Sequence, residues 1–377
     1  MTTTPTADMS TWVLIAGGGT AGHVLPGLAV ARALVAAGHP PESIHWMGSA
    51  VGIEARLVPE AGFGVTLLPG RGVERRLSPA SAAAVWGLVR AAAMALSEVR
   101  RRRPAVVVAL GGYASAPGAA AAIACGVPLV LCEQNAVPGA ANRLFGRFAR
   151  AAAVSFPGTD LARATVTGNP VRAEMLAVDR TRDRDEARRA LGLPADRRVV
   201  VSFGGSLGSR RINQAILAAL DLWAARADLA VRHVVGRRDW AMVSEAAPSL
   251  AAGGLVYQPV EYEERMDLLL AAADLAVCRA GGSVAELTAV GVPAILVPLP
   301  GAPGDHQTAN AHYLVGAGAA VMVPDAELDG PRLAAEVNAL VDDGARLEAM
   351  AAAAAGVAHR HAAEAVAALV TEHARRG

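Results

Sequence analysis

The 377-residue sequence contains no lysine, so all 35 of its basic side chains are arginines. Aromatic residues make up only 4% of the chain, and the formal net charge is +1. A chain so close to neutral gives no overall electrostatic reason to bind nucleic acid. Its three cysteines, Cys125, Cys132 and Cys278, lie in apolar surroundings without the spacing of metal ligands. They predict core thiols in a reducing compartment.

Signals for export and membrane insertion are also missing. Residues 1–10 have neither the basic nor the apolar region of a secretory signal, so we do not expect secretion. The uncharged stretch 104–132 is long enough to span a membrane, but glycines and prolines divide it into strand, turn, helix and strand. We therefore expect no transmembrane helix.

Apolar residues are plentiful, at 53% of the chain, and the length suggests two domains of ~100–200 residues each. Short apolar runs that predict buried strands alternate with helical patterns, which is typical of a parallel sheet covered on both faces. In the first half these runs are 12–16, 43–47, 65–68, 105–110, 128–132 and 151–155. The pattern then restarts, with runs at 199–203, 231–235, 255–257, 275–278 and 294–297. We predict an α/β protein with one doubly wound sheet in residues 1–170 and another in 171–355.

The two halves are separated by a stretch with a different composition. Asn169-Pro170 favours an extended turn, and residues 182–189 are dense in charge, which predicts a linker entering an exposed helix. Asp183 and Asp185 form the D-x-D pattern with which some sugar transferases hold a metal. Because this pair lies in a solvated charge run and not at the end of a strand, we predict no metal site there.

The segment 12–23, WVLIAGGGTAGH, is the strongest local signal. An apolar strand, a glycine turn and a helix, which we expect to open near Pro26, let an anionic ligand approach the main chain closely. The glycines also fit the G-x-G-x-x-G pattern of dinucleotide-binding proteins. Such proteins usually carry an acid at the end of the second strand, where this chain has Gly48 and Ser49. The sequence therefore disfavours a nicotinamide or flavin enzyme.

Polar clusters follow several of the predicted strands. In the first half they are 20–23, 111–115 (GGYAS) and 133–135 (EQN), and in the second 204–208 (GGSLG), 279–286 (RAGGSVAE) and 305–310 (DHQTAN). Parallel sheets bind ligands at the carboxyl ends of their strands. Two such domains predict a transferase that binds a donor in one half and an acceptor in the other, across a cleft.

Seven motifs stand in order between residues 12 and 323: GGGTAGHVLPGLAVA, GGYASAPG, LCEQNAVPGAANR, TGNPVR, FGGSLGSRRIN, CRAGGSVAEL and DHQTANA. Together they resemble the MurG family of bacterial glycosyltransferases. The resemblance implies the GT-B fold, in which two Rossmann-like domains face each other across a cleft. It also implies that a last helix, at about residues 356–377, packs back on the N-terminal domain.

The reaction that this resemblance implies is an inverting transfer of N-acetylglucosamine. The donor is UDP-N-acetylglucosamine, a substrate and not a cofactor, and no metal is expected. The acceptor is the C4 hydroxyl of the lipid-linked N-acetylmuramyl-pentapeptide, so that lipid I becomes lipid II in peptidoglycan synthesis. A GT-B glycosyltransferase for another lipid or a natural-product acceptor is the alternative, and a non-catalytic nucleotide-sugar-binding subunit is a further one.

On the donor side, the matching motifs imply that Arg172 and Ser206 lie at the diphosphate, where they stabilise the charge of the leaving group. Glu286 is expected to accept hydrogen bonds from the ribose hydroxyls, and Gln307 to bind the sugar hydroxyls. The other expected contacts of UDP-N-acetylglucosamine are Thr20, Ala21, Gly22, Asn135, Val260, Gly282 and Ser283.

On the acceptor side, His23 and Glu133 are the two candidates for the catalytic base. An imidazole titrates near neutral pH and His23 follows the glycine turn, which favours it, but helix capping or diphosphate binding is an alternative role. Glu133 is the competing base. Tyr113 and Ser115 are expected to contact the acceptor.

A lipid substrate implies contact with a membrane. Residues 71–103 contain eight arginines against two glutamates, a candidate surface for anionic inner-leaflet lipid. Apolar contacts are expected from Leu77, Trp86, Leu88 and Met94. The alternative is that residues at helical spacing here, namely Trp86, Val89, Ala93 and Leu96, face the core. We expect a peripheral protein on the cytoplasmic face of the bacterial plasma membrane, with other cell-wall synthesis proteins as further partners.

Overall fold

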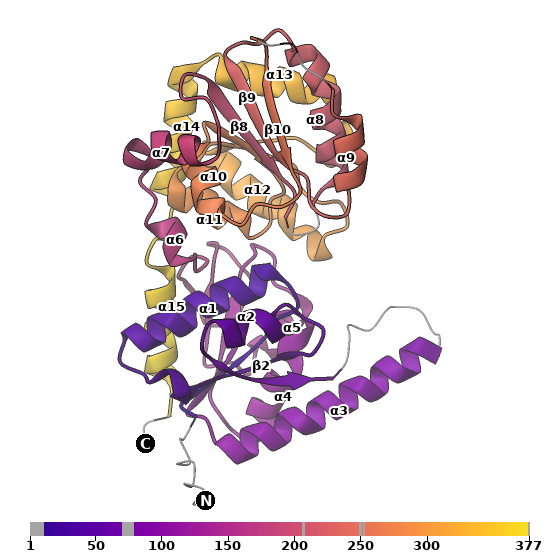
Figure 1. Ribbon diagram of the computed structural model, residues 1–377. Helices are drawn as coiled ribbons and strands as arrows, with labels where there is room; N and C mark the ends of the chain where they lie inside the picture. The colour runs from indigo at the N-terminus through magenta and orange to yellow at the C-terminus, as the bar shows by residue number, and fades with distance from the viewer. Residues whose placement is uncertain (1–10, 70–78, 206–207, 249–250, 252, 376–377) are drawn as a thin grey trace, which may run out of the picture. The chain divides into compact units, whose positions relative to one another are not determined.

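The computed structural model describes residues 11–69, 79–205, 208–248, 251 and 253–375. The chain divides into two compact units. Unit 1 comprises Met1–Pro170 and His361–Gly377, and unit 2 comprises Val171–Arg360. Each unit is an α/β domain built on a sheet of its own (Figure 1).

The sheet of unit 1 has seven strands in the order β3-β2-β1-β4-β5-β6-β7, and all neighbours are parallel. The strands are β1 (Val13–Ala16), β2 (Ile44–Ser49), β3 (Gly64–Leu68), β4 (Val106–Ala109), β5 (Leu129–Glu133), β6 (Ala151–Val154) and β7 (Ala164–Val166). The first six follow the order of a doubly wound nucleotide-binding sheet. The ligand-binding edge of such a sheet is the one at the carboxyl ends of its strands.

Both faces of this sheet are buried. In β1, Val13 and Ile15 join one hydrophobic cluster while Leu14 and Ala16 join another, as period-2 alternation requires. The first face is covered by α1 (Ala21–Ala36), α2 (Glu54–Glu60) and α15 (Ala362–His373). The second face is covered by α3 (Pro79–Arg102) and α4 (Ala116–Ala124), while α5 (Ala140–Gly146) follows β5.

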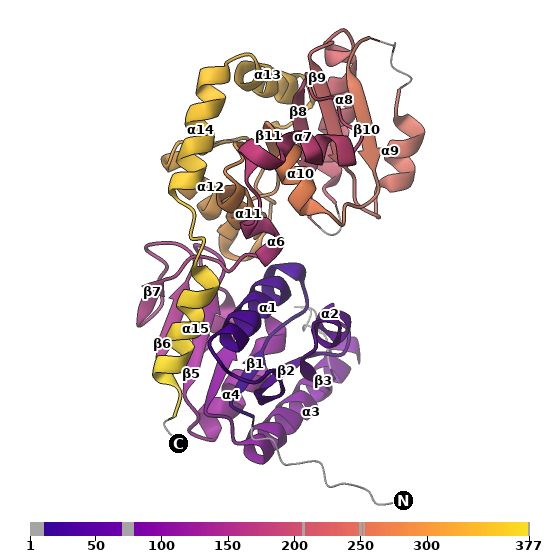
Figure 2. The ribbon, with the colours of Figure 1, turned by 60° about the vertical axis from the view of Figure 1, so that its left-hand side comes forward.

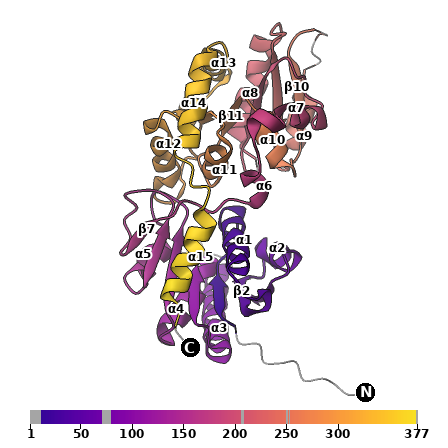
Figure 3. The same cartoon turned by 90° about the vertical axis from the view of Figure 1, so that its left-hand side faces the viewer.

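The last helix belongs to unit 1, although unit 2 precedes it in the chain. α15 packs against α1 and against β4, β5 and β6. Its position along β5 and β6 can be followed in Figure 2, and Figure 3 shows it beside α1. Its apolar side chains Val366, Ala367 and Val370 are buried in the first-face cluster.

The sheet of unit 2 has six parallel strands in the order β10-β9-β8-β11-β12-β13. The strands are β8 (Arg198–Phe203), β9 (Leu229–Val234), β10 (Val256–Val260), β11 (Leu275–Cys278), β12 (Ala294–Leu296) and β13 (Ala320–Met322). The helices are α6 (Ala173–Leu176), α7 (Arg180–Ala190), α8 (Arg210–Trp223), α9 (Trp240–Ala246), α10 (Met266–Ala272), α11 (Ser283–Val290), α12 (His306–Gly316), α13 (Gly330–Val341) and α14 (Gly344–Gly356). Two parallel α/β sheets were predicted, and both are confirmed.

Three local expectations need correction. α1 begins at Ala21, five residues before the expected opening at Pro26. Pro26 is the sixth residue of the helix, where it cannot donate to the carbonyl of Gly22, and the helix continues past it. β7 and β13 were not predicted. Both are three-residue edge strands. All three residues of β7 are exposed, so no buried apolar run in the sequence indicates this strand.

The third correction concerns α3. Its buried stripe is Ala91, Ala95 and Val99, spaced four residues apart. Val89 is 53% exposed and Ala93 is exposed as well, so the alternative that they face the core is wrong for these two residues. It is right for Leu96, which is partly buried against the second-face cluster. Met94, expected to contact lipid, packs against the same cluster. Residues 70–78, which include Leu77, and the side chain of Trp86 lie outside the described part of the chain.

His233 in β9 makes the stability of unit 2 depend on pH. Its ring is 0% exposed and bonds to Asn213 and Tyr257, and burial lowers its pKa to about 4. Since the unfolded pKa is about 6.5, its contribution is complete above pH 6.5 and is lost as the pH falls towards 4. We expect a loss of about 3 kcal/mol, measured by hydrogen exchange of β9 at pH 7 and pH 4. A His233→Gln variant should show a smaller loss, and an identical pH dependence in the variant would contradict this assignment.

Candidate functional site

The glycine turn after β1 is fixed from two sides. The indole N–H of Trp46 donates to the carbonyl of Gly17 at 2.7 Å. The N–H of Gly19, a residue with φ of +90°, donates to the Glu54 carboxylate, also at 2.7 Å. Trp46 and Glu54 are both fully buried. The turn at the carboxyl end of β1 is therefore held by the protein itself.

His23 lies in the first turn of α1, because that helix begins at Ala21. Thr20 is the residue before the helix, and its hydroxyl oxygen lies 3.1 Å from His23 Nδ1. The imidazole also lies over the turn after β4, since a Cβ at Gly112 would be 3.3 Å from its Cε1 atom. The exposed Gly22 and half-buried Ala21 stand beside it. His23 thus carries a partly exposed, oriented imidazole at the carboxyl edge of the sheet.

Glu133 ends β5 and is only 4% exposed. Its Oε1 atom accepts from the main-chain N–H of Asn135 at 3.0 Å and from that residue's side-chain amide at 3.3 Å. Its Oε2 atom accepts from the N–H of Gly139 and from the amide of Asn142, both at 2.9 Å. This carboxylate therefore accepts from three donors of the loop after β5 and one of α5.

The two expected acceptor residues differ in their surroundings. The hydroxyl of Tyr113 is buried and has no hydrogen-bond partner among the described residues, and burial raises its pKa. A buried hydroxyl without a hydrogen-bond partner costs folding free energy unless a ligand supplies that partner. Ser115 is 1% exposed and donates to the carbonyl of Gly112 at 2.9 Å, so its hydroxyl stabilises the β4 turn.

In unit 2, Arg172 and Glu286 form an ion pair. Arg172 precedes α6, Glu286 lies in the first turn of α11, and Nη2 is 3.0 Å from Oε1. The side chains are 26% and 18% exposed. The guanidinium of Arg172 can bind a diphosphate, and the carboxylate of Glu286 can bind hydroxyl groups.

The remaining donor-side residues of unit 2 lie at the end of β10 or follow β11 and β12. Gln307 accepts from the N–H of Leu299 at 2.9 Å, and its Nε2 atom would be 3.7 Å from a Cβ at Gly281. Gly282 precedes α11, and Ser283 is its first residue. The carbonyl of Val260 accepts from Val235, so it is already used within the sheet. Ser206 lies outside the described residues.

Other kinds of site find little support in the described chain. No group of three or more His, Cys, Asp or Glu side chains there is arranged to hold a metal ion. Asp183 of the D-x-D pattern instead pairs with Arg182 at 2.6 Å. Burial raises the pKa of the Cys132 and Cys278 thiols to about 12, so they are not activated nucleophiles. None of the described helices is both long and apolar enough to cross a membrane.

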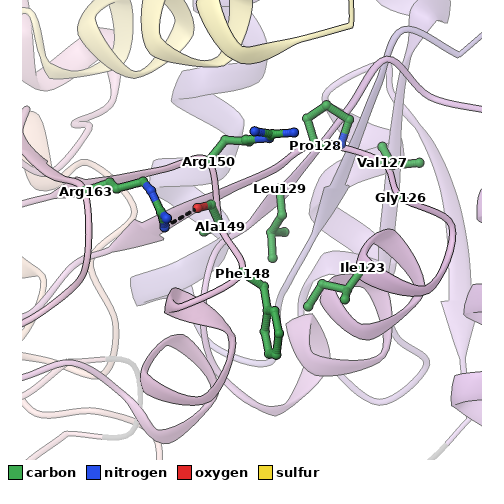
Figure 4. A pocket seen from close by; sticks show the side chains of 9 residues that line it. All are labelled: Ile123, Gly126, Val127, Pro128, Leu129, Phe148, Ala149, Arg150 and Arg163. Atoms are coloured by element: carbon green, nitrogen blue, oxygen red, sulfur yellow. Dashed lines mark hydrogen bonds between the residues drawn. The ribbon is translucent and has the colours of Figure 1, made fainter.

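A cavity of about 250 Å³ lies at the opposite, amino-terminal edge of the unit 1 sheet (Figure 4). It is lined by Ile123, Gly126, Val127, Pro128, Leu129, Phe148, Ala149, Arg150 and Arg163. One of its guanidinium groups, on Arg163, donates to the carbonyl of Ala149 at 2.9 Å. None of the residues expected to bind substrate lines this cavity.

Models of two domain families match the chain. The glycosyltransferase family 28 N-terminal domain matches residues 13–154, and the glycosyltransferase family 28 C-terminal domain matches residues 199–366. The first match spans β1 to β6 of the unit 1 sheet, and the second spans the sheet of unit 2 from the second residue of β8. Fold and matches together define a two-domain glycosyltransferase.

Individual relatives show to which family of glycosyltransferases the chain belongs. A protein of a Nocardioides species is 45% identical over 96% of this chain and 97% of its own, and one of Acidothermus cellulolyticus is 43% identical over 96% and 98%. Both are named UDP-N-acetylglucosamine--N-acetylmuramyl-(pentapeptide) pyrophosphoryl-undecaprenol N-acetylglucosamine transferase. The crystal structure of Acinetobacter baumannii MurG is similar with a TM-score of 0.76 and 29% identity, covering 96% of this chain and 99% of that one. The chain belongs to the MurG family, as the seven motifs predicted.

Sequence reasoning missed Glu54 and Asn142. Asn142 stands in a motif that was noticed, but nothing in the sequence shows that its amide joins Glu133 to the carbonyl of Cys132. Glu54 had a usable signal. It lies four residues before the buried Val58 and therefore on the apolar face of α2, where a carboxylate requires a partner.

Proposed function

We propose that this protein transfers N-acetylglucosamine from UDP-N-acetylglucosamine to the C4 hydroxyl of the lipid-linked N-acetylmuramyl-pentapeptide, with inversion. It is a UDP-sugar-dependent N-acetylglucosaminyltransferase of peptidoglycan synthesis. The observation that carries the proposal is the oriented imidazole of His23 at the carboxyl edge of a family 28 N-terminal domain. Relatives that align with this chain over nearly their full length are named as enzymes of this transfer.

In our proposal, unit 1 binds the acceptor and unit 2 binds most of the nucleotide sugar. His23 is the base that removes the proton of the attacking hydroxyl. It is preferred to Glu133 because an imidazole at the glycine turn titrates near neutral pH, whereas the Glu133 carboxylate already accepts four hydrogen bonds. The unpaired hydroxyl of Tyr113 then donates to the acceptor.

Departure of UDP leaves negative charge on the diphosphate, and we assign its stabilisation to Arg172, together with main-chain N–H groups at the start of α8. Glu286 accepts from the ribose hydroxyls and holds the guanidinium of Arg172 in place. Gln307 contributes its amide N–H to the sugar. The donor is a substrate, and we assign no cofactor or metal to the reaction.

We further propose that the protein works at the cytoplasmic face of the plasma membrane, where α3 contacts anionic lipid. Arg100 to Arg103 lie at or just after the end of α3, and Val89 on the same helix is exposed. Replacing all four arginines with glutamine should weaken binding to phosphatidylglycerol vesicles, and raising the salt concentration should weaken the wild type. Vesicle cosedimentation measures both effects. Equal vesicle binding by the wild type and the variant at low salt would refute the proposed contact of α3 with anionic lipid.

The transfer itself is tested by UDP release. The purified chain is mixed with UDP-N-acetylglucosamine and a soluble, short-chain analogue of the lipid-linked muramyl-pentapeptide, and each substrate is omitted in turn. The proposal expects release only when both substrates are present, and the same rate after a chelator is added. Donor binding without any release would refute transfer to this acceptor and favour another lipid or natural-product acceptor or a non-catalytic subunit.

A further inference from the structure

The carboxylate of Glu54 joins two turns of unit 1. Glu54 is the first residue of α2 and is 0% exposed. Its Oε2 atom accepts from the N–H of Gly19, and its Oε1 atom accepts from the N–H of Ser49, both at 2.7 Å. Gly19 follows β1 and Ser49 ends β2, which are neighbouring parallel strands. One side chain thus ties together the ends of two strands at the carboxyl edge of the sheet.

Three glycines make room for this carboxylate. A Cβ atom at Gly18 would lie 2.0 Å from Oε1, one at Gly52 would lie 2.1 Å from Oε2, and one at Gly48 would lie 2.5 Å from Cγ of Glu54. Real Cβ atoms do not approach other atoms so closely. The glycines at these three positions are therefore explained by the buried side chain between them.

The carboxylate acts on His23 through the main chain. Gly19 is bonded to Thr20, the residue that precedes α1, and the hydroxyl of Thr20 lies 3.1 Å from His23 Nδ1. Fixing the N–H of Gly19 therefore fixes the start of the helix and the hydroxyl that orients the imidazole. Dinucleotide-binding proteins present an acid near this point to the ribose of their ligand. Here the acid is buried and is used by the turn itself.

We propose that Glu54 is a positioning residue for the acceptor half of the reaction, holding the glycine turn so that His23 meets the attacking hydroxyl. This inference rests on the proposed function, because it takes His23, the residue that the turn positions, to be the catalytic base. Glu54 itself touches no substrate. Its two hydrogen bonds are charge-assisted and short, which suits the task of fixing a backbone.

Two substitutions test the charge and the length of the Glu54 side chain separately. Glu54→Gln keeps the length of the side chain but turns one acceptor into a donor that faces a main-chain N–H. Glu54→Asp keeps the charge but withdraws it by one methylene group. Each should lower kcat about 10- to 100-fold, as expected for a displacement near 1 Å, and leave the affinity for UDP-N-acetylglucosamine unchanged within about twofold. Glu60→Gln, in the same helix and exposed, is the matched control.

A double-mutant cycle decides whether Glu54 acts through His23. In a His23→Ala background, Glu54→Gln should lower kcat no more than about threefold, because the group that it positions is gone. Full additivity of the two losses would overturn the inference. A folded Glu54→Asp variant with the kcat of wild type would do so as well.

Hydrogen exchange separates this inference from the proposed function. If His23→Ala leaves turnover intact, the base assignment fails, and the role of Glu54 is then read from the exchange rate of the Gly19 to His23 amides. Glu54→Gln should raise that rate about tenfold over Glu60→Gln, while the β9 peptides of unit 2 stay unchanged. Equal rates in the two variants would overturn the positioning role.

Discussion

Replacing His23 with alanine is expected to lower kcat about 10²- to 10⁴-fold, the usual contribution of a positioned general base. The affinity for UDP-N-acetylglucosamine should stay within about twofold of wild type, because His23 belongs to unit 1 and the proposed donor residues Arg172 and Glu286 belong to unit 2. Steady-state kinetics with both substrates and calorimetric titration with the donor alone measure the two effects. The imidazole is only half-buried, so the variant should fold normally.

Glu286→Ala is the matched variant on the donor side. It should weaken donor binding about tenfold or more, because it removes the acceptor proposed for the ribose and leaves Arg172 without its partner. A large loss of donor affinity in His23→Ala would remove His23 from the acceptor side. Normal turnover in that variant would instead move the base role to another residue.

Replacing Glu133 with alanine is expected to act on stability more than on chemistry. The substitution leaves four donors of the β5 loop and α5 without this acceptor, so the free energy of unfolding should fall by about 3 kcal/mol or more. Urea unfolding, with hydrogen exchange at β5, measures this loss. Glu60→Ala is the control, since its exposed pair with Arg56 contributes at most about 0.5 kcal/mol.

Glu133→Gln tests the competing role of the same residue. It keeps the shape of the side chain and one acceptor oxygen, so it should be less destabilised than Glu133→Ala and should retain measurable turnover. A Glu133→Gln protein with the unfolding midpoint of wild type and a kcat more than about 10³-fold lower would identify Glu133 as the base, against our assignment.

The sheets could be predicted from sequence because their strands are buried on both faces. Runs such as Val13–Ala16 and Val106–Ala109 are apolar throughout, and glycine turns separate them from the helices. The edge strands β7 and β13 escaped prediction because each has only three residues, and those of β7 are all exposed, whereas the five-residue edge strands β3 and β10 were predicted. The start of α1 was misplaced because Pro26 is a strong breaker signal that a helix nevertheless tolerates close to its start.

The site was only partly predictable for a different reason. Motifs identify residues, but a motif gives no account of which hydrogen bonds a side chain already makes. Glu133 and Ser115 have the right chemistry for ligand contact, yet the structure uses both to hold their own turns. Glu54 stands in none of the seven motifs, and its role depends on a strand pairing between segments about thirty residues apart.

The return of α15 to unit 1 has a consequence for synthesis on the ribosome. The first face of the unit 1 sheet is closed by Val366, Ala367 and Val370, which are made only after all of unit 2. At about 5–20 residues per second, translation from residue 171 to this helix takes roughly 10 to 40 s. During that time the nascent first domain exposes an apolar strip along β4, β5 and β6. Unit 2 can complete its own core first, so the second half of the chain is able to mature before the first.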